Sequence, residues 1–399
     1  MDNKTLRETT HDDSTSLDIG TLTYYASTLI TTESAAALII NLYILNCSRY
    51  LRRPIGVNLR LCVSLTAADA ACALFYMTSN LINVIIPTLI NRAQIVSHCI
   101  SLLVECLKIA TFFVSVFILL ALAINHYVGI VHPLYRHAIT TNAVRTTILL
   151  AYVVPMLFFI GLYSVMPGGF RNHRAFGFFS ADGCEGADIM TKFPVRLITV
   201  IPFIIFVITI AFLYFHIVIH MRAVNKDPML HEGSIRKKRS CNRRLLTTLV
   251  LLAGSAALGW LPTLFGHIVF CSECFIRLSG YPLMFLLIFC QVINVFKLIV
   301  DGFVYANRMV EIRYSIWIFH SSCKKLITGQ NEKEERMPKE FVRYLNDTIE
   351  QKSRRVTGHS SGASSFVSRS FNSSRFNVPP LSPGSGAIYA GQVNRKLNV

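Results

Sequence analysis

The stretch that decides the fold is Leu102–Ile124, LLVECLKIATFFVSVFILLALAI. It exceeds the roughly 20 apolar residues that an α-helix needs to cross a bilayer, and beyond Lys108 it carries no charged side chain. A continuous apolar run of this length satisfies its backbone hydrogen bonds within one helix, whereas the strands of a membrane β-barrel are short and alternate in polarity. The stretch therefore predicts a transmembrane helix.

Six further stretches share this length and hydrophobicity. Together with the first they are Tyr24–Leu45, Val57–Thr78, Leu102–Ile124, Val144–Val165, Val195–Val218, Leu245–Phe270 and Leu283–Tyr305. Of the 399 residues, 52% are hydrophobic and 15% are charged, against about a quarter charged in a soluble domain. The sequence predicts an all-α membrane protein, a seven-transmembrane helix bundle at residues 24–307.

The net charge of +17 is unevenly placed. Basic residues crowd the loops after the first, third and fifth spans, as in Arg236–Arg239, and such loops are cytoplasmic. We therefore expect a multi-pass plasma-membrane protein with residues 1–23 extracellular and the C-terminus inside. Residues 1–20 lack the apolar core of a signal peptide, so the first span directs insertion. The sequon at Asn3 lies on the outer side and predicts glycosylation.

Four cysteines fall on the oxidising side, where disulfides form: Cys99, Cys184, Cys271 and Cys274. A Cys99–Cys184 bridge would hold the long second outer loop over the mouth of the bundle. Cys271 and Cys274 would close a small ring. A metal site at this Cys-x-x-Cys pair is the alternative, but no second pair of ligands lies nearby, so we expect no metal.

Polar and aromatic residues within the spans resemble those of the rhodopsin-like (class A) G-protein-coupled receptors over about residues 24–320. The matching positions, in order on successive spans, are Asn41, Leu65–Asp69, Pro202, Trp260 with Pro262, and Asp301–Tyr305. Departures from the family pattern include Asn125-His126-Tyr127 in place of Asp-Arg-Tyr, Gly302 in place of a proline, and the lack of a tryptophan in the fourth span. The resemblance implies an extracellular ligand, a heterotrimeric G protein and arrestin as partners.

In this family Asp69 lines a sodium-binding cavity together with Ser115 and polar residues of the seventh helix. The resemblance implies a polar cavity of Asn41, Asp69, Ser115, Lys297 and Asp301. Lys297 precedes Asp301 by four residues, so both side chains project from one helical face. We hypothesise that the Lys297 ammonium substitutes for sodium. The alternative is that Lys297 snorkels or only balances Asp301, with Asp69 a paired structural residue.

The resemblance also implies a conformational switch formed by Asn125, His126, Tyr127, Trp260, Pro262, Asp301 and Tyr305. In the family, an arginine pairs with a neighbouring acid and, in many members, with an acid at the base of helix six. Here His126 stands at the arginine position, and Asn125 and Asn242 stand at the two acid positions. An imidazole is mostly neutral at cytosolic pH, so no ionic lock is expected. We predict weak, shifted or constitutive coupling, with ordinary signalling as the alternative. Pro262 is the expected hinge, because proline kinks a helix.

A ligand pocket is implied between the outer halves of the third, fifth, sixth and seventh helices. Its expected residues are Glu105, Lys108, Phe112, Trp260, Phe265, His267, Gln291 and Asn294. Lys108 stands where monoamine receptors place an aspartate, so a typical monoamine is disfavoured. Glu105 and Lys108 either neutralise each other as i,i+3 neighbours, or Lys108 with His267 and Gln291 favours an acidic ligand. A peptide or a small molecule is open, and the aromatic residues are equally compatible with core packing.

After the bundle, residues 308–319 predict an amphipathic helix on the membrane surface. Cys323 is a candidate for palmitoylation, and the tail 320–399, rich in Ser, Arg, Gly and Asn, is predicted to be disordered. Its Ser and Thr clusters fit an arrestin signal after phosphorylation. Its end, Leu397–Val399, fits a PDZ domain.

The sequence contains no P-loop, no Rossmann glycine set and no zinc-binding helix motif. We therefore expect neither an enzyme nor a cofactor. Nucleic acid is not expected as a partner, because topology explains the polycations, which also attract anionic membrane lipids. Two other functions are open: a receptor-like protein that does not signal, and a small-solute transporter.

Overall fold

The computed structural model describes residues 3–53, 55–92, 95–170, 184–186, 189, 192–225, 247, 250–251, 253–266, 269, 280–328, 337–346 and 349, with side chains from residue 20 onward except at 136–138 and 325. All regular structure in these residues is helical. The elements are α1 Asn3–Ser48, α2 Val57–Asn80, the π-helix η1 Leu81–Ile85, α3 Ile86–Ile90, α4 His98–Val131, the 3-10 helix η2 Pro133–Ala138, α5 Thr141–Val165, α6 Phe193–Asn225, α8 Tyr281–Arg308 and α9 Val310–Thr328. Residues 253–266 are also helical.

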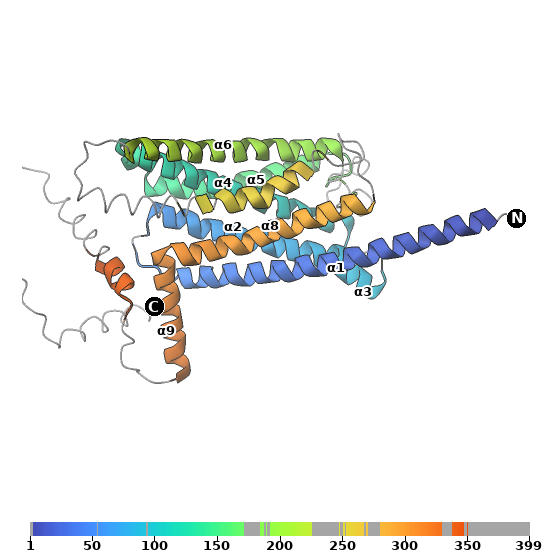
Figure 1. Cartoon of the computed structure of the whole chain (residues 1–399), viewed down its shortest axis with the longest axis horizontal. Coiled ribbons are helices and arrows are strands. Elements are labelled where there is room, and N and C mark those ends of the chain that lie inside the picture. The colour runs from blue at the N-terminus through green and yellow to red at the C-terminus, as the bar shows by residue number, and fades with distance from the viewer. Residues whose placement is uncertain are drawn as a thin grey trace, which may run out of the picture. The chain divides into compact units, whose positions relative to one another are not determined.

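The helix α4 forms the centre of the bundle. It packs against α2, α5 and α6, while α1 packs against α2 and α8 (Figure 1). Its buried side chains come from every turn between Cys99 and His126. A helix buried on most of its circumference is apolar on nearly all sides, and this is why Leu102–Ile124 is predominantly apolar.

Among the described residues, six helices are long and apolar enough to cross a membrane. They are Gly20–Ser48, Val57–Ile90, His98–Val131, Thr141–Val165, Phe193–Ala223 and Tyr281–Arg308. These six coincide with six of the seven predicted spans. The helical residues 253–266 lie inside the other predicted span, Leu245–Phe270, part of which is outside the described residues.

Local sequence explains several helix ends. Ser97 caps α4 by accepting a hydrogen bond from the Ile100 amide at 3.4 Å, and Thr140 caps α5 through Ala143 at 3.2 Å, as serine and threonine do at helix starts. The second span continues past its predicted end at Thr78 through η1 and α3. It stops where Asn91 adopts a left-handed backbone, with φ 54°, a conformation that asparagine tolerates better than most residues.

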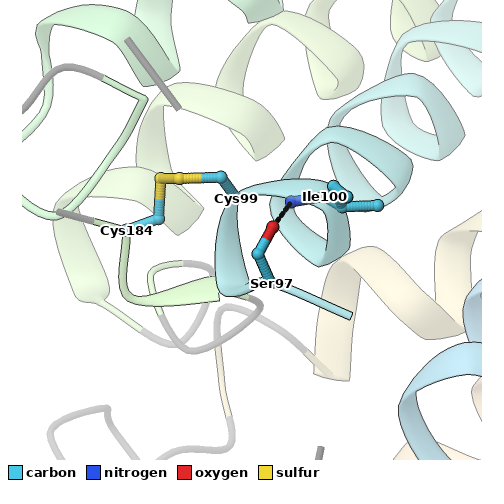
Figure 2. The surroundings of a disulfide bond; sticks show 4 residues. All are labelled: Ser97, Cys99, Ile100 and Cys184. Atoms are coloured by element: carbon cyan, nitrogen blue, oxygen red, sulfur yellow. Dashed lines mark hydrogen bonds between the residues drawn. A yellow bond between two sulfur atoms is a disulfide. The ribbon is translucent and has the colours of Figure 1, made fainter. Parts of the chain in front are cut away.

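A disulfide joins the start of α4 to the loop before α6. It links Cys99 to Cys184, whose Cα atoms are 5.2 Å apart (Figure 2). The predicted Cys99–Cys184 bridge is confirmed. Cys271 and Cys274 lie outside the described residues, so their pairing stays a prediction. We call this end of the bundle the disulfide end and the opposite end, at the C-terminus of α4, the His126 end.

The segment after the bundle differs from its predicted bounds. The helix α9 runs to Thr328, beyond the predicted end at residue 319, and residues 339–346 are helical although the tail 320–399 was predicted to be disordered. Phe341 is 8% exposed because its ring packs on Tyr314 and Trp317, at centroid distances of 5.7 and 5.9 Å. Burial of these rings stabilises a segment whose composition alone predicts disorder. We call residues 338–344 the tail segment.

Candidate functional site

Three ionisable side chains meet in the middle of the bundle. Lys297 and Asp301 lie one turn apart on α8, and Asp69 faces them from α2. The Lys297 ammonium is 2.9 Å from Asp301 Oδ2 and 3.5 Å from Asp69 Oδ1. Asp69, Lys297 and Asp301 are 0%, 3% and 2% exposed. Isolated charges are costly in this environment and pair with one another, so we call the three residues the charge cluster.

Hydroxyl groups from two more helices complete the surroundings of the charge cluster. Ser115 of α4 donates to Asp69 Oδ1 at 2.9 Å, and Ser255, in the helical residues 253–266, donates to Asp301 Oδ1 at 2.6 Å. Four of the five predicted cavity residues are thus brought together. The fifth, Asn41 of α1, donates instead to the backbone carbonyl of Leu298 at 3.1 Å, so it fastens α1 to α8 beside the charge cluster.

Trp260 and Gly259 bring helix 253–266 against the lysine. The Lys297 ammonium lies 4.5 Å from the centroid of the Trp260 ring, a cation–π contact. A Cβ atom at position 259 would lie 2.8 Å from Lys297 Cβ and 2.9 Å from Lys297 Cγ. Only glycine leaves room for the lysine stem at this position.

Trp260 also belongs to a buried aromatic cluster. Its ring lies 5.3 Å from Phe112 of α4 and 5.2 Å from Phe203 of α6, and the last two rings stack at 4.9 Å. The helices that carry these three side chains therefore meet at one point. Trp260 therefore contacts both the aromatic cluster and the charge cluster.

A second ion pair lies on α4, toward the disulfide end. Glu105 Oε2 is 2.5 Å from Lys108 Nζ, and Glu105 Oε1 accepts a hydrogen bond from Ser79. The Lys108 ammonium also lies 5.1 Å from the ring centroid of Tyr76. The two side chains therefore neutralise each other in this structure, which is the first of the two predicted arrangements.

The remaining predicted pocket residues are distributed differently from the prediction. Asn294 is buried and donates to Thr263 Oγ1 at 2.7 Å, which ties α8 to helix 253–266. Phe265 is 62% exposed, and at about 100° per residue it lies about 140° around the helix from buried Trp260. Its place in the pocket stays a prediction. His267 lies outside the described residues.

Gln291 is exposed, although it shares a face of α8 with buried Asn294 and Val295. It therefore lies at the accessible end of the inward face.

The sequence of residues 38–305 matches that of a known protein family, described as 7 transmembrane receptor (rhodopsin family). The chain belongs to the rhodopsin family of seven-transmembrane receptors. The predicted all-α seven-transmembrane fold is thereby confirmed, and the chain is a multi-pass membrane protein and not an enzyme. The resemblance seen in its motifs is confirmed as well.

A distant relative is the adenosine receptor A2a of Equus caballus. Its sequence is 26% identical to this chain over 276 residues, which cover 64% of this chain and 65% of the relative. The chain thus spans just under two thirds of the length of this curated relative.

The triplet Asn125-His126-Tyr127, which departs from the family pattern, lies at the His126 end of the receptor. His126 is 5% exposed, and no carboxylate of the described residues forms an ion pair with it. Asn125 donates to Asn58 of α2, and the Tyr127 ring lies 5.4 Å from His216 of α6. The predicted helix-six partner position, Asn242, lies outside the described residues.

Two residues that contact the receptor's charge cluster were not predicted. Ser255 and Gly259 lie in an apolar run, where a serine usually bonds to its own helix and a glycine has many uses. Neither carries a signal in a single sequence. Ser255 and Gly259 are four residues apart and lie on one face of the helix, and Trp260 directly follows Gly259. This spacing becomes informative only when the rotation of the helix is known.

Proposed function

We propose that the chain is a plasma-membrane receptor that transmits the binding of an extracellular ligand to heterotrimeric G proteins. Membership of the family supports this role. The observation that carries it is the position of Trp260, which contacts Phe112 and Phe203 and also the ammonium of Lys297. A ligand that moves this ring alters the charge cluster beneath it, and so couples the two ends of the bundle.

The proposed orientation places the disulfide end outside the cell. Disulfides persist in oxidising compartments, and the basic loops lie on the other side, as cytoplasmic loops do. In this orientation the N-terminus is extracellular and the sequon at Asn3 is available for glycosylation. The surface helix α9 then contacts inner-leaflet lipid, and Cys323, a free and partly exposed cysteine, is available for palmitoylation.

We propose a ligand without net charge. Glu105 and Lys108 form a balanced pair at 2.5 Å, so an ion of either sign would have to displace one partner from the other. The rings of Phe112 and Trp260 and the amide of Asn294 favour a flat molecule with hydrogen-bonding groups. The relative is named for adenosine, an uncharged nucleoside, which makes adenosine the first probe. A carboxylate ligand that competes with Glu105 for Lys108 is the contrasting probe.

We further propose that the receptor couples without ligand. In the family an arginine pairs with acids to hold the closed state, and the equivalent His126 has no carboxylate partner in the described part of the chain. A closed state that lacks this pair lies closer in free energy to the open state. Basal coupling is the expected consequence. Arrestin at a phosphorylated tail and a PDZ domain at Leu397–Val399 are proposed as further partners.

Nucleotide exchange tests the signalling role. Membranes that contain the receptor are compared with empty membranes on a panel of purified G proteins, with and without adenosine or a small carboxylate. We expect exchange above the empty-membrane control before any ligand is added. His126→Arg, at matched surface expression, introduces the family's guanidinium. If neither protein stimulates exchange on any G protein, with or without ligand, the signalling role is contradicted and a receptor-like, non-signalling protein is indicated.

A further inference from the structure

Two acids and one base share the charge cluster. Asp69 and Asp301 approach the same ammonium from α2 and α8, at 3.5 and 2.9 Å. Each carboxylate also accepts one hydroxyl hydrogen bond, from Ser115 and Ser255 respectively. The second oxygen of Asp69, Oδ2, is buried and has no hydrogen-bond partner among the residues that the structure describes. A site with this composition attracts a cation.

The oxygen atoms alone suit a small hard cation such as sodium, which prefers carboxylate and hydroxyl ligands. However, the Lys297 ammonium already lies against one oxygen atom of each carboxylate. A metal ion on the same carboxylates would lie next to this ammonium, and two like charges at such a distance inside a protein repel strongly. The residues present therefore do not fit a sodium ion.

We propose that Lys297 is the permanent cation of this site. The unsubstituted receptor then has no specific response to sodium. Loss of the ammonium turns the oxygen atoms of Asp69, Ser115, Asp301 and Ser255 into a sodium-binding site. The ammonium is tethered to α8, so its effective concentration at the two carboxylates exceeds that of any dissolved ion.

Helix 253–266 holds the lysine in this position. The lysine stem passes over Gly259, where a Cβ atom would lie 2.8 Å from Lys297 Cβ, and the ammonium lies over the Trp260 ring at 4.5 Å. The stem is thus packed against a bare backbone, and the cation contacts an aromatic face as well as the two acids. Gly259 is in this sense a positioning residue for the internal cation.

The proposal is tested by thermal unfolding of the purified receptor in lipid nanodiscs. The melting temperature is measured against increasing sodium chloride, with choline chloride keeping the ionic strength constant. The unsubstituted receptor is expected to show no difference between the two salts. Lys297→Asn, which removes the ammonium and leaves space, is expected to show a saturable sodium-specific rise of about 3 °C or more.

Two controls isolate the cause. Lys297→Arg keeps a cation at this position and is expected to show no sodium-specific rise. Lys297→Asn with Asp69→Asn removes one carboxylate and is expected to lose the rise of the single variant. Lys297→Gln replaces Lys297→Asn if the latter does not fold.

A saturable sodium-specific rise in the unsubstituted receptor that Asp69→Asn abolishes would overturn the proposal, whatever the variants do. So would a folded Lys297→Asn or Lys297→Gln protein that does not distinguish sodium from choline. No ligand and no G protein enter the measurement. Its outcome is therefore independent of the proposed signalling role.

Discussion

Lys297 Nζ lies 3.5 Å from Asp69 Oδ1, which joins two residues that are 228 positions apart in the chain. The contact crosses from α8 to α2, and Lys297 reaches Asp301 on its own helix at 2.9 Å. One ammonium therefore serves two buried carboxylates. The balance of charge in this site, more than any single contact, governs its energetics.

This balance predicts losses of different size for two substitutions. Lys297→Met leaves two buried acids without a base, and we expect it to lower the free energy of unfolding by about 3–5 kcal/mol. Asp301→Asn leaves a matched pair of Asp69 and Lys297, so its loss should be clearly smaller. Denaturant-induced unfolding in matched detergent micelles measures both. Equal losses for the two variants would contradict the charge-balance argument.

Gly302 permits close packing of α1 on α8. A Cβ atom there would lie 3.0 Å from Ile40 Cγ2 and 3.5 Å from Asn41 Oδ1. We predict that Gly302→Leu overpacks this contact and lowers the free energy of unfolding by about 1–3 kcal/mol. Gly161→Leu in α5 is the matched control, since a Cβ atom there meets nothing within 4 Å. The packing argument fails if both leucine variants unfold at the same denaturant concentration.

The sequence predicted some of these contacts and not others. The four-residue spacing of Lys297 and Asp301 placed them on one face, because helix geometry is local. Asp69 and Ser115 were placed through the family resemblance. Ser255 and Gly259 were missed, since each contact depends on how helix 253–266 is rotated in the bundle.

The tail segment was missed for a related reason. Phe341 and Tyr344 are too few apolar residues to predict a packed helix by themselves. Their partners Tyr314 and Trp317 lie on α9, and such contacts between separate elements leave no periodic signal in the sequence.

For Lys108, the sequence left two arrangements open. The 2.5 Å contact between Lys108 and Glu105 in the structure distinguishes them.

Docking of the tail segment on α9 predicts a fluorescence change. The chain has two tryptophans, Trp260 and Trp317, so Trp260→Phe leaves Trp317 as the only tryptophan reporter. In this background Phe341→Ala should shift the emission maximum to longer wavelength, because Trp317 loses a ring 5.9 Å away and gains water. Val342→Ala, at a side chain that is 43% exposed, is the control and should change nothing. Identical spectra for both variants would mean that the tail segment does not cover Trp317.

The disulfide should contribute to stability by restricting the unfolded chain. Cys99 and Cys184 are separated by 85 positions, and closing a loop of this length is worth about 4.5 kcal/mol in the chain-entropy model. Cys184→Ser should therefore lower the melting temperature, and a reducing agent should lower that of the parent protein but not of the variant. A variant that melts with the parent would rule out this contribution.

In the proposed arrangement, helix 253–266 holds Lys297 as the internal cation of the receptor. The most direct test of this arrangement compares Gly259→Ala with Gly254→Ala, since an added Cβ atom collides with the Lys297 stem at position 259 but meets nothing within 4 Å at position 254. Melting temperatures are measured in sodium chloride and in choline chloride. We expect Gly259→Ala to gain a sodium-specific stabilisation, because the displaced ammonium leaves the carboxylates. Gly254→Ala should gain none. A Gly259→Ala protein that melts at the same temperature in both salts would contradict the proposed arrangement.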